Sequence, residues 1–160
     1  TIQSFGGHFG YSCWSAWHPD GHRFATGNGD DRTCHIWDAR NLSKSVFALG
    51  GNVGPISSIS FTSDGSFMAM SEGFDFVRVY DVRADFKREH EIDFFGYVSG
   101  LCFSPDTISF YQCLHGYFPN PFIVQTMQTR VLLPGFYALT RILNSKPTLS
   151  LLAFIGCLNN

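Results

Sequence analysis

Four side chains near the start of the sequence have the types and spacing of a zinc site: Cys13, His18, His22 and Cys34. The two histidines are four residues apart, but they flank a Pro-Asp-Gly turn. Cys34 lies in an alternating apolar segment, and no Cys-x-x-Cys pair occurs in the sequence. We therefore predict structural roles for these residues, and we predict that the protein uses no metal and no cofactor.

Other segments contain residue types that are used in catalysis, but their arrangement argues against it. Residues 27–31 are glycine-rich, yet a phosphate-binding loop needs a following helix, and the carboxylates of Asp30 and Asp31 would repel phosphate. No motif places a histidine beside a nucleophile. The sequence predicts that the protein is not an enzyme, and a pocket that gathered Asp30, His18 and His35 would favour the opposite hypothesis.

Composition places the chain among globular, β-rich proteins. Of its 160 residues, 44% are hydrophobic, and 17 Phe, 6 Tyr and 16 Gly favour short strands and tight turns. A net charge of -2 provides no basic surface for nucleic acid. The longest apolar stretch, residues 149–158, is too short for a membrane-spanning helix. The five cysteines are widely spaced and odd in number, which indicates reduced thiols and a cytoplasmic or nuclear location.

A repeat organises the first two thirds of the sequence. Its turn segments start at Ala16, Ser60 and Cys102, and each contains an aspartate, at positions 20, 64 and 106. The first two turns precede a strand of small residues and then an alternating strand that ends in an aromatic residue and an aspartate, Trp37-Asp38 and Tyr80-Asp81. Such a unit is one antiparallel sheet, in which the Asp-Gly turn lets two strands reverse tightly.

The repeat resembles the WD40 (transducin-like) repeat. The match consists of Gly7-His8, the Pro-Asp-Gly turn, and Trp37-Asp38 thirty residues after Gly7, with a repeat length in the family's range. The resemblance covers residues 1–106. Residues 40–46, 91–96 and 104–106 are similar to an uncharacterised branch of WD-repeat proteins from plants and fungi.

The resemblance implies a hydrogen-bonded set inside each repeat, made by a histidine, a strand Ser or Thr, a turn aspartate and the tryptophan. His8, Asp31 and Trp37 match three members. The Ser/Thr position falls on Trp14, with Ser15 beside it, so the sequence predicts a broken or shifted set. The predicted structural network of both repeats comprises His8, Asp31, Trp37, Asp38, Ser58, Tyr80 and Asp81.

The second repeat departs further from the pattern. Asn52 replaces the histidine, Phe74 the turn aspartate and Tyr80 the tryptophan, which leaves only Ser58. We therefore expect this repeat to depend on apolar packing.

The predicted fold is all-β, a partial β-propeller of about two to three four-stranded antiparallel sheets. We expect ten strands: 1–5, 11–17, 23–28, 33–38, 45–49, 56–61, 67–72, 76–81, 89–93 and 97–103. The resemblance implies that the first of these strands closes a preceding sheet.

The sequence changes character after Asp106. All 13 acidic residues lie in residues 1–106, whose net charge is -5, whereas residues 107–160 carry +3. We predict a repeat region at 1–106 and an irregular, atypical apolar tail at 107–160, disordered or of non-homologous origin such as a read-through intron or an alternative exon. An apolar extension that packs on the propeller is the alternative.

The architecture favours a non-catalytic scaffold that binds other proteins, an inference from fold alone. A truncated isoform without a function of its own is one alternative, and a propeller enzyme is another. We expect protein partners, no nucleic acid, no membrane, and self-association through open sheet edges.

Overall fold

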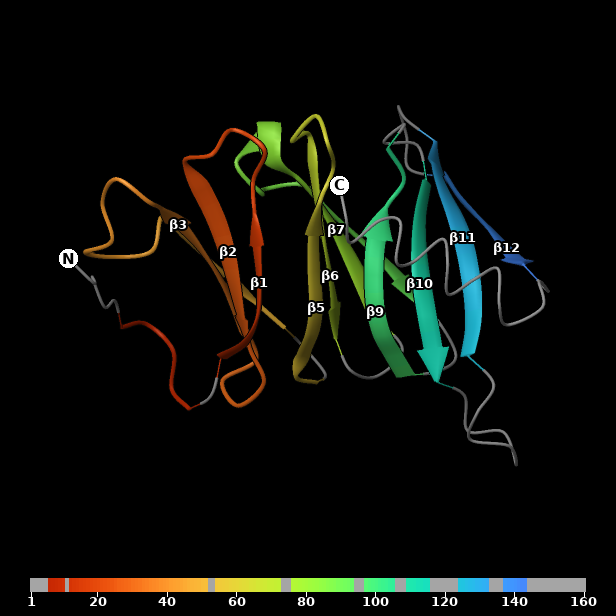
Figure 1. Cartoon of the computed structure of the whole chain (residues 1–160), viewed down its shortest axis with the longest axis horizontal. Coiled ribbons are helices and arrows are strands. Elements are labelled where there is room, and N and C mark those ends of the chain that lie inside the picture. The colour runs from red at the N-terminus through yellow and green to blue at the C-terminus, as the bar shows by residue number, and fades with distance from the viewer. Residues whose placement is uncertain are drawn as a thin grey trace.

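The computed structural model describes residues 6–10, 12–51, 54–72, 76–93, 97–105, 109–115, 124–132 and 137–143. These residues form three four-stranded antiparallel sheets that lie side by side (Figure 1). The first sheet contains β1 (Ser12–Trp17), β2 (Arg23–Asn28), β3 (Thr33–Asp38) and β4 (Phe47–Gly50). The second contains β5 (Ile56–Phe61), β6 (Phe67–Glu72), β7 (Phe76–Asp81) and β8 (Glu89–Asp93). The third contains β9 (Tyr97–Phe103), β10 (Ser109–His115), β11 (Val124–Leu132) and β12 (Tyr137–Leu143).

Neighbouring strands in each sheet are consecutive in the sequence, so every sheet is a simple meander. The first strands of the three sheets, β1, β5 and β9, are next to one another (Figure 1). The all-β, partial-propeller expectation is confirmed. Nine of the ten expected strands are present, and the strand expected at 1–5 lies outside the described residues.

The two Asp-Gly turns form as predicted. Gly21 and Gly65 have φ of 70° and 71°, a backbone region that favours glycine. The Gly21 N–H donates to the His18 carbonyl at 3.0 Å, and the Gly65 N–H donates to the Thr62 carbonyl at 2.9 Å. Each turn therefore reverses the chain between the first two strands of its sheet.

The residues after 106 differ from the expected irregular tail. β10, β11 and β12 pair in continuous register, from Ser109↔Arg130 to His115↔Val124 and from Thr126↔Leu143 to Leu132↔Tyr137. The expectation followed from the loss of charge, but charge is not needed for pairing, and these segments are rich in the β-branched and aromatic residues that favour strands. The domain boundary at 106 and the different origin of 107–160 stay predictions.

Two hydrophobic cores lie between the sheets. Side chains of the first and second sheets form one core, in which Ala25, Ile36 and Met68 are fully buried. Side chains of the second and third sheets form the other, which includes Val77, Val98 and Phe103. The second sheet therefore uses both faces, as the alternation of its strands allows.

Candidate functional site

A pocket of about 420 Å³ lies where β1, β5 and β9 end. The three sheets contribute equivalent segments to it, each an aromatic residue followed by a polar one: Trp17 and His18, Phe61 and Thr62, Phe103 and Ser104. These residues lie within the three predicted turn segments, ahead of the aspartate of each. The repeat therefore builds the pocket by placing the same short segment at the end of each first strand.

His18 connects the first sheet to the second at this pocket. Its ring is buried, and Nε2 lies 3.0 Å from the carbonyl oxygen of Gly65, to which it donates. Nδ1 lies 3.2 Å from the backbone nitrogen of Asp20 and 3.0 Å from its carboxylate. The Phe61 ring packs edge-on against the imidazole, with centroids 5.2 Å apart. His18 is thus a structural contact between two sheets as well as part of the pocket wall.

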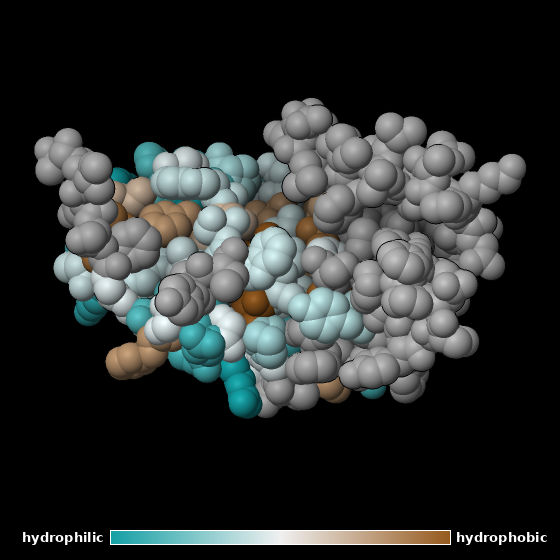
Figure 2. All heavy atoms as spheres, turned by 60° about the horizontal axis from the view of Figure 1, so that its bottom comes forward, coloured by the Kyte–Doolittle hydropathy of each residue, from teal (hydrophilic) through white to brown (hydrophobic). Residues whose placement is uncertain are grey.

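Trp17 is the most exposed aromatic residue of the pocket wall, with 61% of its surface accessible. It packs against Phe24, whose ring centroid lies 5.0 Å away, and Phe24 is stacked in turn against Trp37 at 6.4 Å. Figure 2, in which the bottom of the Figure 1 view comes forward, shows hydrophobic residues at the surface among hydrophilic ones. A large exposed aromatic side chain beside a pocket is typical of protein-binding surfaces.

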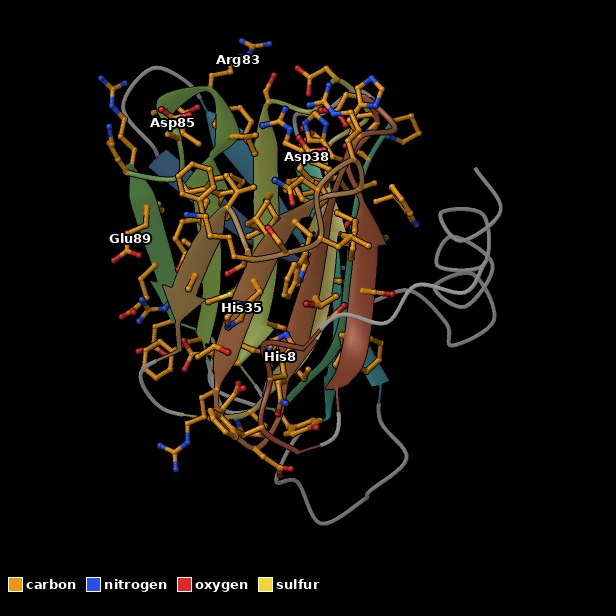
Figure 3. All side chains as sticks on the ribbon, turned by 90° about the vertical axis from the view of Figure 1, so that its left-hand side faces the viewer. His8, His35, Asp38, Arg83, Asp85 and Glu89 are labelled. Atoms are coloured by element: carbon orange, nitrogen blue, oxygen red, sulfur yellow. The ribbon has the colours of Figure 1, made fainter. Side chains whose placement is uncertain are left out.

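A hydrogen-bonded set lies inside the first sheet. His8 Nε2 lies 2.8 Å from Thr26 Oγ1, and Trp37 Nε1–H donates to the same hydroxyl at 2.7 Å. His8 Nδ1 lies 3.1 Å from Asp31 Oδ2. The set joins the segment before β1 to β2 and β3, and Figure 3 shows His8 and His35 near each other on this sheet.

Thr26 is the hydroxyl member of this set, so the prediction that this position falls on Trp14, with Ser15 beside it, and that the set is broken or shifted, is wrong. Thr26 is on β2 and pairs directly with Ser15 on β1 and with His35 on β3. One signal was present in the sequence, because Thr26 is the one hydroxyl in the otherwise apolar segment 24–27. Such a group needs a partner when it is buried.

Asp31 is a strong acceptor in the same set. Burial alone would raise the pKa of its carboxyl group, but hydrogen bonds from the Thr33 side chain and backbone, the Phe9 N–H and His8 outweigh this and lower the pKa to about 2. The carboxylate is therefore charged at neutral pH and fixes the turn before β3.

His35 packs against this set, in contact with the rings of His8 and Trp37. Its ring stacks on Trp37 with centroids 5.7 Å apart, and its Nδ1 lies 3.0 Å from Ser45 Oγ. Burial, and then the nearby His8, lower the pKa of His35. The ring therefore favours its neutral form.

The aspartates that end the third strands fix the turns that follow. Asp38 accepts from the backbone and the guanidinium of Arg40, chiefly the latter, which lowers its pKa to about 2. Asp81 Oδ1 accepts from the backbone N–H groups of Arg83 and Ala84, and so caps the short 3-10 helix η1 (Val82–Ala84). Asp38 and Arg83 lie at the same end of the molecule in Figure 3.

The second sheet places Ser58 and Tyr80 in different surroundings. Ser58 Oγ accepts from the Leu101 N–H of the third sheet at 3.3 Å. Tyr80 is buried, and this burial, together with the charge of Glu89, raises the pKa of its phenol. Asn52 and Phe74 lie outside the described residues.

The second sheet also contains a buried ion pair, so the expectation that this repeat depends on apolar packing is incomplete. Arg78 Nε donates to Glu72 Oε1 at 2.9 Å, and the two side chains are 5% and 0% exposed. A charge in the alternating apolar strand Val77-Arg78-Val79 was the available signal.

The zinc candidates are dispersed. Cys34 is fully buried in the core between the first two sheets, and this burial raises the pKa of its thiol to about 12, which opposes the thiolate form that zinc binds. His18 contacts Gly65, and the side chain of Cys13 lies outside the described part of the chain. No group of three or more His, Cys, Asp or Glu side chains among the described residues is placed to hold a metal ion.

The glycine-rich segment 27–31 comprises the end of β2 and the start of the turn after it, and Gly27 packs against the second sheet. Asn28 Oδ1 accepts from the backbone N–H groups of Asp30 and Asp31. A Cβ atom on Gly27 would lie 2.6 Å from the Ile56 side chain, so close packing explains this glycine. Of Asp30, His18 and His35, only His18 lines the pocket at the strand ends.

Across the described residues, the structure contains no helix with the length and apolar character needed to cross a membrane.

Comparisons with known proteins agree with this architecture. Residues 1–38 match the WD40 family, described as "WD domain, G-beta repeat". The pre-mRNA-processing factor 19 of Oryza sativa subsp. japonica is 35% identical over 77 residues, which are 48% of this chain and 14% of that protein.

Two solved structures share the fold. The β-propeller domain of Cps50 (Swd1) from Myceliophteria thermophila has a TM-score of 0.70 and 24% identity, and the match covers 89% of this chain and 42% of that one. A chain of the mitotic checkpoint complex has a TM-score of 0.74 and 20% identity, and the match covers 91% of this chain and 43% of that one. The chain thus spans less than half the length of each of these relatives. Residues 1–38 thus match the WD40 repeat, the chain shares the fold of β-propellers, and its described residues form an open, partial propeller.

Proposed function

We propose that this chain is a non-catalytic protein-binding module that contacts its partner through the pocket at the ends of β1, β5 and β9. WD40 propellers are typically scaffolds for protein interactions, and one solved neighbour is a chain of the mitotic checkpoint complex. The observation that carries the proposal is Trp17, which is 61% exposed beside a pocket built from three sheets. We further propose a cytoplasmic or nuclear location and the absence of nucleic acid and lipid partners.

Several features support a binding role over a catalytic one. The polar residues of the pocket wall face backbone or turn groups: His18 contacts Gly65, and Thr62 Oγ1 accepts from the Phe67 N–H at 3.0 Å. These two side chains are thus engaged in contacts that hold the fold, which supports a structural role for them. The propeller-enzyme alternative would need a further acid or base in this pocket.

Comparative affinity capture tests the proposal. We expect Trp17→Ser to lose the proteins that the wild-type chain retains, because the exposed indole supplies much of the apolar contact area. Trp14→Ser is the matched control. Trp14 pairs with Gly27, at which a Cβ atom would point to Ile56 in the second sheet. Trp17 pairs with Phe24, so the Trp14 and Trp17 side chains lie on opposite faces of β1.

Two outcomes would contradict the proposal. If both variants retain the same proteins as the wild type, the pocket face is not the binding surface. If the wild-type chain retains nothing above a tag-only control, the truncated-isoform alternative is favoured. Mass spectrometric detection of an endogenous peptide that spans Asp106 to Gly116 would then show whether cells contain the polypeptide at all.

A further inference from the structure

The second sheet lacks the hydroxyl on which the hydrogen-bonded set of the first sheet depends. Thr26 pairs with His35 in the first sheet, and the corresponding pair in the second sheet is Met70 with Arg78. A methionine cannot accept hydrogen bonds as the Thr26 hydroxyl does from Trp37. The second sheet, whose strands are paired through their backbones, therefore lacks this side-chain set.

Arg78 and Glu72 supply polar contacts across four segments. Arg78 on β7 donates from Nε to Glu72 on β6 at 2.9 Å and from a terminal nitrogen to Glu91 on β8. A second terminal nitrogen lies 3.6 Å from Glu89 on β8. The other carboxylate oxygen of Glu72 accepts from the Gly54 N–H at 3.2 Å, in the connection between β4 and β5.

The connection approaches Glu72 closely. A Cβ atom on Gly51 would lie 3.3 Å from Glu72 Cδ and 2.9 Å from the Arg32 carbonyl oxygen. Gly51 also donates to this carbonyl at 2.7 Å. The Glu72 carboxylate thus contacts the segment that connects the first sheet to the second.

Burial makes the two charges depend on each other. A carboxylate that is 0% exposed is strongly disfavoured without a cation, because it has lost its hydration. Glu89 and Glu91 are 55% and 47% exposed, so water compensates their charges in part. The charge of Glu72 therefore depends on the Arg78 guanidinium more than the charges of Glu89 and Glu91 do.

We propose that Glu72 and Arg78 form an ionic clasp that holds the connection between the first and second sheets against the second sheet. The clasp takes the topological place of the set made by His8, Thr26 and Trp37, because both join the segment before the first strand to the second and third strands. Arg78 acts on the connection through Glu72 and is a positioning residue for it.

Native-state hydrogen exchange of the whole chain tests the clasp. Arg78→Met leaves Glu72 buried without its cation, so we expect the Gly54 amide to lose at least about tenfold of its protection. The Thr33 amide, which donates to Asp31 in the first sheet, should keep its protection. Arg83→Met is the control, because it removes an exposed ion pair: the Arg83 side chain is 73% exposed, and its guanidinium lies 3.5 Å from the Asp64 carboxylate.

A double variant separates the clasp from a general loss of packing. In Glu72→Met/Arg78→Met no buried charge remains, so we expect a higher denaturant midpoint than in Arg78→Met alone. Additive effects of the two substitutions, or unchanged Gly54 protection in Arg78→Met, would overturn the proposal. If Arg78→Met does not fold, Arg78→Lys decides: the clasp predicts a folded chain with weakened Gly54 protection, and wild-type protection would contradict it.

Discussion

The Thr26 hydroxyl accepts a hydrogen bond from Trp37 Nε1–H at 2.7 Å and lies 2.8 Å from His8 Nε2. One small side chain on β2 thus joins the indole of β3 to the segment before β1. Because Trp37 and Thr26 are buried, neither group can exchange its partner for bulk water.

Replacement of Thr26 by valine should therefore destabilise the protein. The change keeps the shape but leaves the indole N–H without its acceptor and His8 Nε2 without its partner, which should lower the free energy of unfolding by about 1–3 kcal/mol. Urea denaturation measures it. Ser43→Ala is the control, because that hydroxyl is exposed and donates to the nearby Asn41 Oδ1 at 2.7 Å. Equal midpoints for Thr26→Val and the parent would show that the set adds nothing to stability.

Asp31 should make stability depend on pH in the acid range. Its pKa is lowered from 3.8 to about 2 in the folded chain, so the unfolded state binds the proton more readily. The contribution is complete above the unfolded value and is lost as the pH falls from about 4 to about 2. The measurement is unfolding free energy against pH for the parent and Asp31→Asn. The difference between them should shrink over this window, and a constant difference would exclude the carboxylate as its source.

Asp31→Ala should lower the free energy of unfolding at neutral pH by about 1–3 kcal/mol, because it removes the acceptor of the Thr33 and Phe9 amides and the contact with His8. A chemical denaturation midpoint identical to that of the parent would reject a structural role for Asp31.

Gly65→Ala should be more damaging than Gly21→Ala. Both glycines have φ near 70°, so the backbone strain is matched. A Cβ atom on Gly65 would lie 2.4 Å from His18 Nε2, whereas on Gly21 it would meet nothing within 4 Å. We expect the Gly65 variant to be less stable by about 1–3 kcal/mol, a typical cost of overpacking. Thermal denaturation of the pair measures the difference, and equal stabilities would show that His18 can move aside.

Zinc should not be a structural constituent. The Cys34 thiol is buried, and its pKa is raised to about 12. Treatment with a chelator should leave the thermal midpoint unchanged, and metal analysis should find far less than one zinc per chain. A stoichiometric amount of zinc that survives gel filtration would contradict this prediction.

The chain of residues 1–160 should associate in solution. Propellers close with about 4–8 sheets, and the described residues form three, so ring closure is not available to them. Open edges and faces of sheets recruit other strands. Size-exclusion chromatography with light scattering should therefore show oligomers or aggregates. A monomer that unfolds cooperatively would show that residues 107–160 complete the structure.

The sequence alone determined the local parts of this protein. Alternating residues and two Asp-Gly turns predicted β2, β3, β6 and β7 with the bounds that the structure has, because side-chain alternation and positive φ are properties of neighbouring residues. It also placed His8, Asp31 and Trp37 in one repeat, through the spacing that the family shares.

Only the tertiary structure decided which side chains meet. Thr26 reaches Trp37 because of the register between β2 and β3, and Arg78 reaches Glu72 and Glu91 because β6 and β8 flank β7. The pocket likewise joins Trp17, Phe61 and Phe103, which are more than forty residues apart. Strand register and the packing of one sheet against the next set these distances, and neither is fixed by the local pattern of a single segment.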